Sequence, residues 1–279
     1  MDNHRSTIAG LFLKNSENNL IQIDNSISAF NTYFMINVQK VNIICMKWGT
    51  KYGPEYVNRL YSMVSRNLTV PHRFVCFTDD VKGLEKGIET FPMPEIYVPE
   101  KNRVSPWMKL SLLGETLGDL EGQSLFLDLD IVIIENIDCF FANPGKFCII
   151  ENWTQKGQGV GNSSVYRFEI GAHKDVLEYY TKNPEKVVAE YDNEQIFLSK
   201  MIGGQGDLSY WPAQWCKSFK RHCVPKGVLR FIKTPEIPSG AKIIVFHGHP
   251  HPDEAIKGAW PGAWYKHVKP TSWVADYWK

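Results

Sequence analysis

The chain has 279 residues, with 31 lysines and arginines, 30 aspartates and glutamates and a formal net charge of +1. A chain of this length can form one large α/β domain or two small ones, and it is long enough to bury a substantial core. The balanced charge excludes the broad basic surface typical of nucleic-acid binding, so we expect no nucleic-acid partner. Any polyanion must be bound at a local site.

Cysteine spacing and hydropathy narrow the class of protein further. The six cysteines are scattered, with no CxxC pair and no zinc-ligand spacing, which predicts reduced core residues. No apolar run approaches the roughly 20 residues of a membrane span. The first residues lack the apolar stretch of a secretory signal. We therefore expect a cytoplasmic protein.

The first part of the chain differs in composition from the rest. Residues 1–38 are polar, rich in Asn and Ser, and show no sustained period, so a poorly ordered extension is expected. Residues 39–279 contain no internal repeat or low-complexity tract. We expect them to form a single domain.

Strand-like and helix-like segments alternate from residue 41 onward. The apolar segments 41–46 and 72–78 predict strands. Helices are expected over residues 54–67, where a proline stands at the first helical position, and over residues 105–117. This alternation is typical of a doubly wound sheet. Later segments predict strands at 147–150, 164–168 and 242–246 and helices at 174–181 and 193–201.

Two aspartates interrupt the most apolar stretch of the chain. Residues 126–134 are apolar except for Asp128 and Asp130. A run that is apolar at both parities predicts a strand buried on both faces of a sheet. Residues i and i+2 share a face, so both carboxylates are expected to point into the crevice where open α/β sheets bind ligands. Along a strand they would lie roughly 6.6 Å apart, close enough to share one divalent cation.

A structural alternative is that Asp128 and Asp130 only end a strand and begin a turn, as aspartates often do. The apolar residues 131–134 continue beyond the pair, so the acids do not stand at a polar boundary. This favours a ligand-binding role.

An Asp-x-Asp that ends a buried strand, after a strand, helix, strand unit, resembles the metal site of the GT-A glycosyltransferases. The resemblance is strongest to family 8, the glycogenin and lipopolysaccharide galactosyltransferase-like group, and it covers residues 41–255. It implies an α/β fold of GT-A type, with a Rossmann-like, doubly wound mixed sheet and a C-terminal acceptor-side portion. Four further segments fall in the family's order: Trp107-Met108-Lys109-Leu110, Asn162-Ser163-Ser164-Val165, Asn193-Glu194-Gln195 and Phe246-His247-Gly248.

The resemblance implies a hexosyltransferase of glycan or lipopolysaccharide synthesis. Such an enzyme moves a sugar from a nucleotide-diphosphate donor, here expected to be a UDP-sugar, to a hydroxyl of a glycan or glycolipid. A divalent ion bridging the diphosphate oxygens neutralises the charge that grows on the leaving group. By resemblance Asp128, Asp130 and His247 hold this ion, and their mixed oxygen and nitrogen set suits Mn²⁺ or Mg²⁺.

The resemblance also assigns contacts to the donor. Lys109 matches a basic position directed toward the donor, and Tyr52 matches an aromatic residue that packs on the nucleobase. Asn162 and Ser163 belong to the donor-binding segment after the metal site. Two structural alternatives stay open, in which Lys109 is a solvated helix residue and Tyr52 is a turn residue packed on Pro54.

The stretch 247–252 departs from the family pattern. Family members place a lysine before a proline to grip the phosphate, whereas His251 precedes Pro252 here. A neutral imidazole is a weaker phosphate partner than an ammonium group. Alternatively, His247, His249 and His251 form a separate metal site.

Residues 192–195 lie where the family places polar side chains near the reacting sugar carbon. Asp192 or Glu194 is a candidate base for the acceptor hydroxyl, and Gln195 is a candidate for steadying the sugar. In the alternative, Asp192 or Asn193 only caps the following helix.

Tryptophans and lysines gather toward the end of the chain. The tryptophan rings either stack on sugar faces or pack in the core. Together with the lysines they also suit a peripheral contact with an anionic membrane that carries a lipid-linked acceptor. Besides a purely cytoplasmic location, the sequence therefore allows a cytoplasmic protein that associates with a membrane. The residues are Trp211, Trp215, Trp260, Trp264, Trp273, Trp278, Lys257, Lys266, Lys269 and Lys279.

Two other functions compete with sugar transfer. Asp128, Asp130 and Val132 also fit the nucleophile motif of haloacid dehalogenase-like phosphatases. That motif normally opens its domain, but about 90 residues of the expected domain precede it here and no later acidic pair of the required kind follows. The other alternative is a catalytically inactive carbohydrate-binding protein on a transferase fold, against which the presence of Asp128, Asp130 and His247 argues.

Overall fold

The computed structural model describes residues 40–102, 106–263 and 265–279. Lys40–Lys279 forms one compact unit. The extension expected at residues 1–38, the expected helix start at Ser105 and the ring of Trp264 lie outside the described residues.

The first strand, helix, strand unit follows the sequence pattern closely. Strand β1 (Val41–Lys47) pairs in parallel with β2 (His72–Thr78), with Val41 opposite His72. Helix α2 (Pro54–Asn67) connects them and buries one apolar face, as its 3.6-residue period predicts. The helix ends where the backbone becomes extended at Leu68, whose N–H bonds the carbonyl of Val64.

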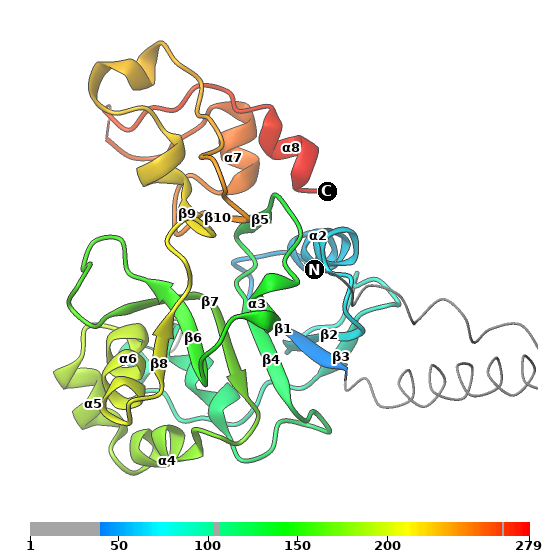
Figure 1. Cartoon of the computed structure of the whole chain (residues 1–279), viewed down its shortest axis with the longest axis vertical. Helices are drawn as coiled ribbons and strands as arrows, with labels where there is room; N and C mark the ends of the chain where they lie inside the picture. Colours follow the sequence, from blue (N-terminus) through cyan, green and yellow to red (C-terminus); the bar gives the residue numbers. More distant parts are fainter. Residues whose placement is uncertain (1–39, 103–105, 264) are drawn as a thin grey trace, which may run out of the picture. The chain divides into compact units, whose positions relative to one another are not determined.

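Seven strands of this compact unit form a mixed sheet (Figure 1), in the order β3-β2-β1-β4-β7-β6-β8. Strand β4 runs parallel to β1, and β7 is antiparallel to both of its neighbours, β4 and β6. This confirms the mixed α/β sheet expected from the sequence. The remaining strands are β3 (Glu89–Phe91), β4 (Gln123–Leu127), β6 (Phe147–Glu151), β7 (Gly161–Glu169) and β8 (Leu208–Tyr210).

The apolar run 126–134 is not one strand, and this part of the sequence interpretation is wrong. Strand β4 ends at Leu127, and β5 (Ile131–Ile133) belongs to a second, three-stranded sheet. There β5 pairs with β10 (Ile243–Val245), which also pairs with β9 (Cys216–Ser218). The ends of β4 and β5 that meet at the turn are both buried, so the residues stay apolar while the backbone passes from one sheet to the other. Asp128 to Asp130 form the turn between them.

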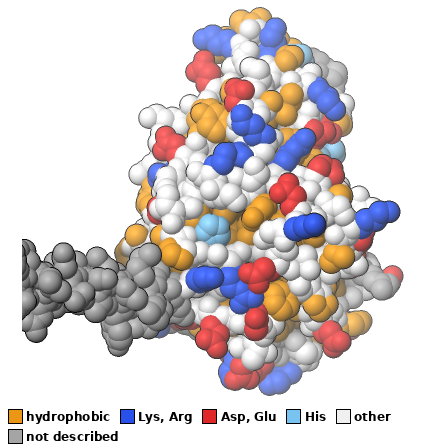
Figure 2. Space-filling view, turned by 90° about the vertical axis from the view of Figure 1, so that its right-hand side faces the viewer, with side chains coloured by type: hydrophobic (Ala, Val, Ile, Leu, Met, Phe, Trp, Pro, Cys, Tyr) orange, Lys and Arg blue, Asp and Glu red, His pale blue; other side chains and the backbone are white. Residues whose placement is uncertain are grey.

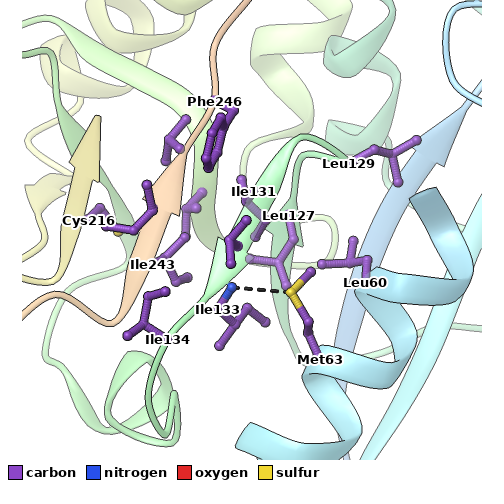
Figure 3. Packing of buried hydrophobic residues seen from close by; sticks show 14 of the residues in the cluster. Leu60, Met63, Leu127, Leu129, Ile131, Ile133, Ile134, Cys216, Ile243 and Phe246 are labelled. Atoms are coloured by element: carbon purple, nitrogen blue, oxygen red, sulfur yellow. Dashed lines mark hydrogen bonds between the residues drawn. The ribbon is translucent and has the colours of Figure 1, made fainter. Parts of the chain in front are cut away.

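Side chains from α2 and from both sheets pack together at this junction (Figure 3). Leu60 and Met63 of α2 lie beside Leu127 and Ile133, while Ile243 lies on the β10 side. The backbone N–H of Ile133 even donates to Met63 Sδ at 3.4 Å. This buried packing supports the turn between β4 and β5.

Alternate residues of the central strands face two separate cores. Ile43 and Leu125 point to the core under α2, whereas Ile44 and Phe126 point to the opposite one. Helices and a 3₁₀ segment cover this second face, where Trp107 stacks on Tyr180 at 5.7 Å between ring centres. The further helices are α3 (Cys139–Ala142), α4 (Lys174–Lys182), α5 (Pro184–Glu190), α6 (Glu194–Gly204), α7 (Pro252–Lys257) and α8 (Trp273–Tyr277).

Four short helical segments complete the described chain. The segment expected as a helix over 105–117 is a 3₁₀ helix at Pro106–Leu113, and six of its eight residues are buried. Lys109 and Ser111 are buried along with its apolar residues, so tertiary burial rather than a one-sided period decides its geometry. The others are 3₁₀ helices at Glu100–Asn102 and Gly227–Phe231 and a π-helix at Phe219–Cys223.

Core packing accounts for the late tryptophans that the structure describes. Trp211 and Trp278 are buried, and Trp215, Trp260 and Trp273 are partly buried against the same core. Across the described chain, every helix is too short or too polar to traverse a bilayer. All six cysteines are free, and five of them are buried, as their scattered spacing predicts. On the face shown in Figure 2, basic and acidic side chains are interspersed.

Candidate active-site cleft

A cleft of about 700 Å³ opens where β1 and β4 end. The carboxyl ends of the parallel strands β1 and β4 lie side by side, which is where open α/β sheets bind ligands. Nine of the eleven site residues expected from the sequence line this single cleft, and Asp192 and His251 do not. The lining consists of residues 46, 48–52, 106, 109, 128–130, 162–164, 193–195, 247 and 248.

The two aspartates lie on the cleft floor with different partners. Asp128 Oδ1 is 2.7 Å from Lys109 Nζ, and the Tyr52 hydroxyl donates to Asp130 Oδ2 at 2.8 Å. Burial and the charge of Asp128 raise the pKa of Asp130 to about 6. Burial, and then the Asp130 charge, likewise raise the pKa of Tyr52. The pair therefore concentrates negative charge that a bound cation would relieve.

His247 reaches the same cleft from the end of β10. The N–H of Phe246 donates to the Asp130 carbonyl at 2.9 Å, which fixes the backbone of the two segments together. The imidazole stacks on Trp153, and its Nε2 is 2.7 Å from Ser218 Oγ. Burial, followed by the charge of Lys220, lowers the pKa of His247 to about 4. The ring is therefore neutral near pH 7, which is the form that binds metals.

The pair of Asp128 and Asp130 is better placed for a divalent cation than the full predicted ligand set, which also includes His247. Among the described residues, no three His, Cys, Asp or Glu side chains are grouped so that they would hold one ion. Asp128 and Asp130 supply the hard oxygens that Mg²⁺ and Mn²⁺ prefer. To add a third ligand, His247 Nε2 would have to exchange Ser218 for the metal. The three-residue metal site stays a prediction.

A buried polar chain continues from Asp128 along the cleft. Lys109 Nζ donates to the Ser163 carbonyl at 3.2 Å, and Ser163 Oγ donates to Glu194 Oε1 at 2.6 Å. Lys109 is 8% exposed and Glu194 is 3% exposed. Burial works against the lysine charge, but Asp128 and Glu194 outweigh it and raise the pKa of Lys109. Lys109 is thus a charged link between two carboxylates, and its interpretation as a solvated helix residue is wrong.

The start of α6 brings the remaining polar side chains into the cleft. Gln195 Oε1 accepts from Asn162 Nδ2 at 3.3 Å and lies 3.4 Å from the Ser163 backbone N–H. Asn193 caps the helix, because its side chain accepts from the Ile196 N–H. The side chain of Asp192 is exposed and lies outside the cleft lining.

Tyr52 and His251 lie together beside the cleft. The Tyr52 ring is tilted against Tyr56, at 4.8 Å between centres, and edge-on to His251 at 5.6 Å. Tyr52 therefore contacts Asp130 and other aromatic rings, so it has a role beyond packing on a turn. His251 itself stands at the N-terminus of α7.

Sequence reasoning missed Lys220. It belongs to the π-helix after β9, and its Nζ donates to the carbonyl of His247. A side chain added at Gly248 would come within 3.8 Å of this ammonium group, so Lys220 stands directly behind the loop that lines the cleft. Only pairing between β9 and β10 brings the two segments together, and no local pattern signals it.

Comparison with known proteins supports the fold. No protein-family model matches the sequence, and no curated protein matches it significantly. Among solved structures, the galactosyltransferase LgtC in complex with donor and acceptor sugar analogues is similar, with a TM-score of 0.50 and 12% identity over 76% of this chain and 88% of LgtC. An active-site glutamine-to-glutamate mutant of LgtC matches with the same score and identity over 89% of its length. The chain therefore has the GT-A fold that its sequence predicts.

Proposed function

We propose that this protein is a metal-dependent glycosyltransferase that uses a nucleotide-diphosphate sugar, with a UDP-sugar as the donor. The carrying observation is the convergence of Asp128, Asp130, Lys109 and Glu194 on one cleft of about 700 Å³ in a GT-A fold. That volume lies in the range of small-molecule sites, roughly 300 to 1,000 Å³. The donor and acceptor analogues bound to LgtC support a sugar donor and a glycan or glycolipid acceptor for this chain.

The aspartates are held in a geometry suited to a cation. Lys109 engages one oxygen of Asp128 and Tyr52 one oxygen of Asp130. The other oxygen of each carboxylate accepts no hydrogen bond from a described residue and remains for a ligand. Bound Mn²⁺ or Mg²⁺ would supply Lewis-acid stabilisation of the diphosphate leaving group. His247 is the proposed third ligand.

Other cleft residues bind and orient the substrates in this proposal. Glu194 and Gln195, which line the cleft, contact the transferred sugar. Asn162 and Ser163 hold the donor beside them. Lys220 takes the place of the phosphate-gripping lysine that the sequence lacks before Pro252, and His251 assists at the other side of Tyr52. Asp192, outside the lining, is the weakest of the predicted catalytic groups.

The competing functions have less support. In haloacid dehalogenase-like phosphatases the Asp-x-Asp strand opens the domain, whereas here β1, α2 and β2 precede it. The cleft keeps both carboxylates proposed for the metal, Asp128 and Asp130, which supports an enzyme over a carbohydrate-binding protein without activity. Slow hydrolysis of a UDP-sugar in the absence of acceptor would separate the enzyme from such a binding protein.

Titration of UDP in the presence and absence of Mn²⁺ tests the proposal. We expect UDP with Mn²⁺ to raise the melting temperature, because a ligand that binds only the folded state stabilises it. The variant Asp130→Asn should lose the metal-dependent part of this shift. Equal binding of UDP with and without metal, or no UDP binding at all, would contradict the proposed function.

A further inference from the structure

A second, smaller pocket lies beside the cleft. Its volume is about 140 Å³, and its lining includes Trp153, Lys156, Trp211, Lys217 and His222. A cavity of about 150 Å³ holds one benzene ring, so this pocket has room for about one six-membered ring. Trp211 is buried in the core and forms part of the pocket wall, whereas Trp153 is only partly buried, and tryptophan faces pack well on the apolar faces of sugar rings.

Trp153 connects this pocket with the cleft. Its ring stacks on His247, which lines the cleft, with 5.4 Å between ring centres and 20° between planes. Its Nε1 donates to the Cys216 carbonyl of β9 at 3.3 Å, which fixes the ring between the two spaces. A molecule with one ring in the small pocket would therefore lie across Trp153 from His247 and the cleft.

The charges around the small pocket are not balanced. No ion pair between described residues involves Lys156 or Lys217. The lining holds one carboxylate, Glu151, which accepts from the Gly157 N–H at 2.9 Å, against the two ammonium groups of Lys156 and Lys217. The segment after Lys217 adds further cations. In a chain with a net charge of only +1, this is a local excess of positive charge.

Further cations extend this excess along the same side of the cleft. Besides the effect of burial, the charges of Lys217, Arg221 and Lys226 lower the pKa of His222, so all three lie near it. Lys220, in the same segment, donates to the carbonyl of His247. Cations without an ion pair beside a ring-sized pocket, as Lys156 and Lys217 are, suit an anion that is carried on a ring.

We propose that the small pocket is an acceptor subsite for a sugar that bears a carboxylate or a phosphate ester, recognised by Lys217 and Lys156 and packed against Trp153. This inference rests on the proposed sugar transfer, because it supplies the acceptor of that reaction. It adds that the acceptor is anionic, and that its charged ring sits beside the cleft on the side of β9.

Saturation-transfer NMR with small sugars tests the subsite without knowledge of the full acceptor. The probes are methyl glucuronide, glucose phosphate and neutral methyl glucoside, each measured with the full chain, with and without UDP and Mg²⁺. We expect both anionic sugars, or one of them, to bind about tenfold or more tightly than the neutral one, as a charge-assisted hydrogen bond provides. Comparison of the two anionic probes shows which acidic group the site takes.

Lysine variants test whether the anionic sugar binds in the small pocket. Lys217→Met and, separately, the exposed Lys156→Met should reduce binding of the anionic sugar while leaving UDP binding unchanged. The matched control is Lys182→Met, at the end of α4. Added salt should weaken the anionic probe and leave the neutral one unaffected.

Three outcomes would overturn the inference. They are equal binding of neutral and anionic sugars, no binding of either anionic sugar, and anionic binding that is unchanged in both Lys217→Met and Lys156→Met. A separate titration with UDP decides the proposed function. If UDP binds with metal but the sugar results fail, the acceptor inference alone is wrong. If UDP does not bind, the transferase proposal fails regardless of the sugar results.

Discussion

Lys109 Nζ lies 2.7 Å from Asp128 Oδ1, and the ammonium group is almost completely buried. The same side chain contacts Ser163, which in turn donates to Glu194. One cation thus links the carboxylate proposed for the metal with the carboxylate proposed for the sugar. Because both acids depend on it, Lys109 affects stability as well as ligand binding.

Replacing Lys109 with methionine should therefore be costly. The change leaves Asp128 and Glu194 without their buried counter-charge, and loss of one partner of a buried pair destabilises by about 3 to 5 kcal/mol. Urea unfolding measures this loss. Lys182→Met, an exposed control, should change stability by less than about 0.5 kcal/mol. A Lys109→Met protein as stable as the parent would show that the link carries no energy.

Asp130→Asn should stabilise the metal-free protein while it abolishes metal-dependent UDP binding. Asp130 has a folded pKa of about 6, against a reference of 3.8. The folded state therefore holds a proton longer than the unfolded state, and stability falls as the pH rises from about 4 to about 6. Above that window the penalty is complete, and its removal should add roughly 2 to 3 kcal/mol at pH 7.

Thermal unfolding of Asp130→Asn and the parent at pH 4 and pH 7 checks this sign. The two proteins should differ most at pH 7 and least at pH 4, since at low pH the parent carries a neutral side chain as well. A variant less stable than the parent at pH 7 would mean that Asp130 is not destabilised by its surroundings.

Arg167 should be among the most sensitive residues outside the cleft. Its buried guanidinium donates to the carbonyls of Phe140, Asn143 and Gly145, at 2.7, 2.8 and 2.6 Å, and so holds the end of α3 and the following loop. Arg167→Met leaves these acceptors unpaired, at about 1 to 3 kcal/mol for each buried group. We expect a loss of several kcal/mol, or failure to accumulate folded protein.

The control for Arg167 is Arg73→Met, which removes an arginine from ion pairs with Glu89 and Asp119 at the surface. Exposed pairs contribute about 0 to 1 kcal/mol, so this variant should unfold close to the parent. Urea denaturation of both variants makes the comparison. Similar losses for the two would refute the structural role of Arg167.

Lys220→Met should weaken binding of UDP but not of uridine. The ammonium group contacts the backbone of His247 and lies near Gly248, two residues of the cleft lining, so we assign its charge to the diphosphate and no contact to the nucleoside. Loss of one charge-assisted contact should reduce the UDP affinity about tenfold. Isothermal titration of UDP and uridine with Mn²⁺ measures both. Lys186→Met on α5 is the control, and an equal loss for UDP and uridine would indicate a general disturbance of the cleft.

Much of the fold follows from local pattern, and the reason is visible at α2 and its flanking strands. The 3.6-residue period, the proline at the helix start and the short apolar runs predict the helix at Pro54–Asn67 and the strand at His72–Thr78 with their observed ends. These features depend on residues only a few positions apart. The two carboxylates of Asp128 and Asp130 are visible in the same way, because charges inside an apolar run have few structural uses.

Features that depend on contacts between residues far apart in the sequence were decided only by the tertiary structure. Hydrophobicity alone shows that residues 126–134 are buried, but β5 leaves the central sheet because β10, more than a hundred residues later, pairs with it. The same pairing brings Lys220 to the carbonyl of His247 and turns the imidazole toward Ser218. The burial of Lys109 likewise depends on β7 and α6. A local pattern encodes burial and period, whereas the identity of each side chain's neighbour is fixed only when the strands pair and the cores close.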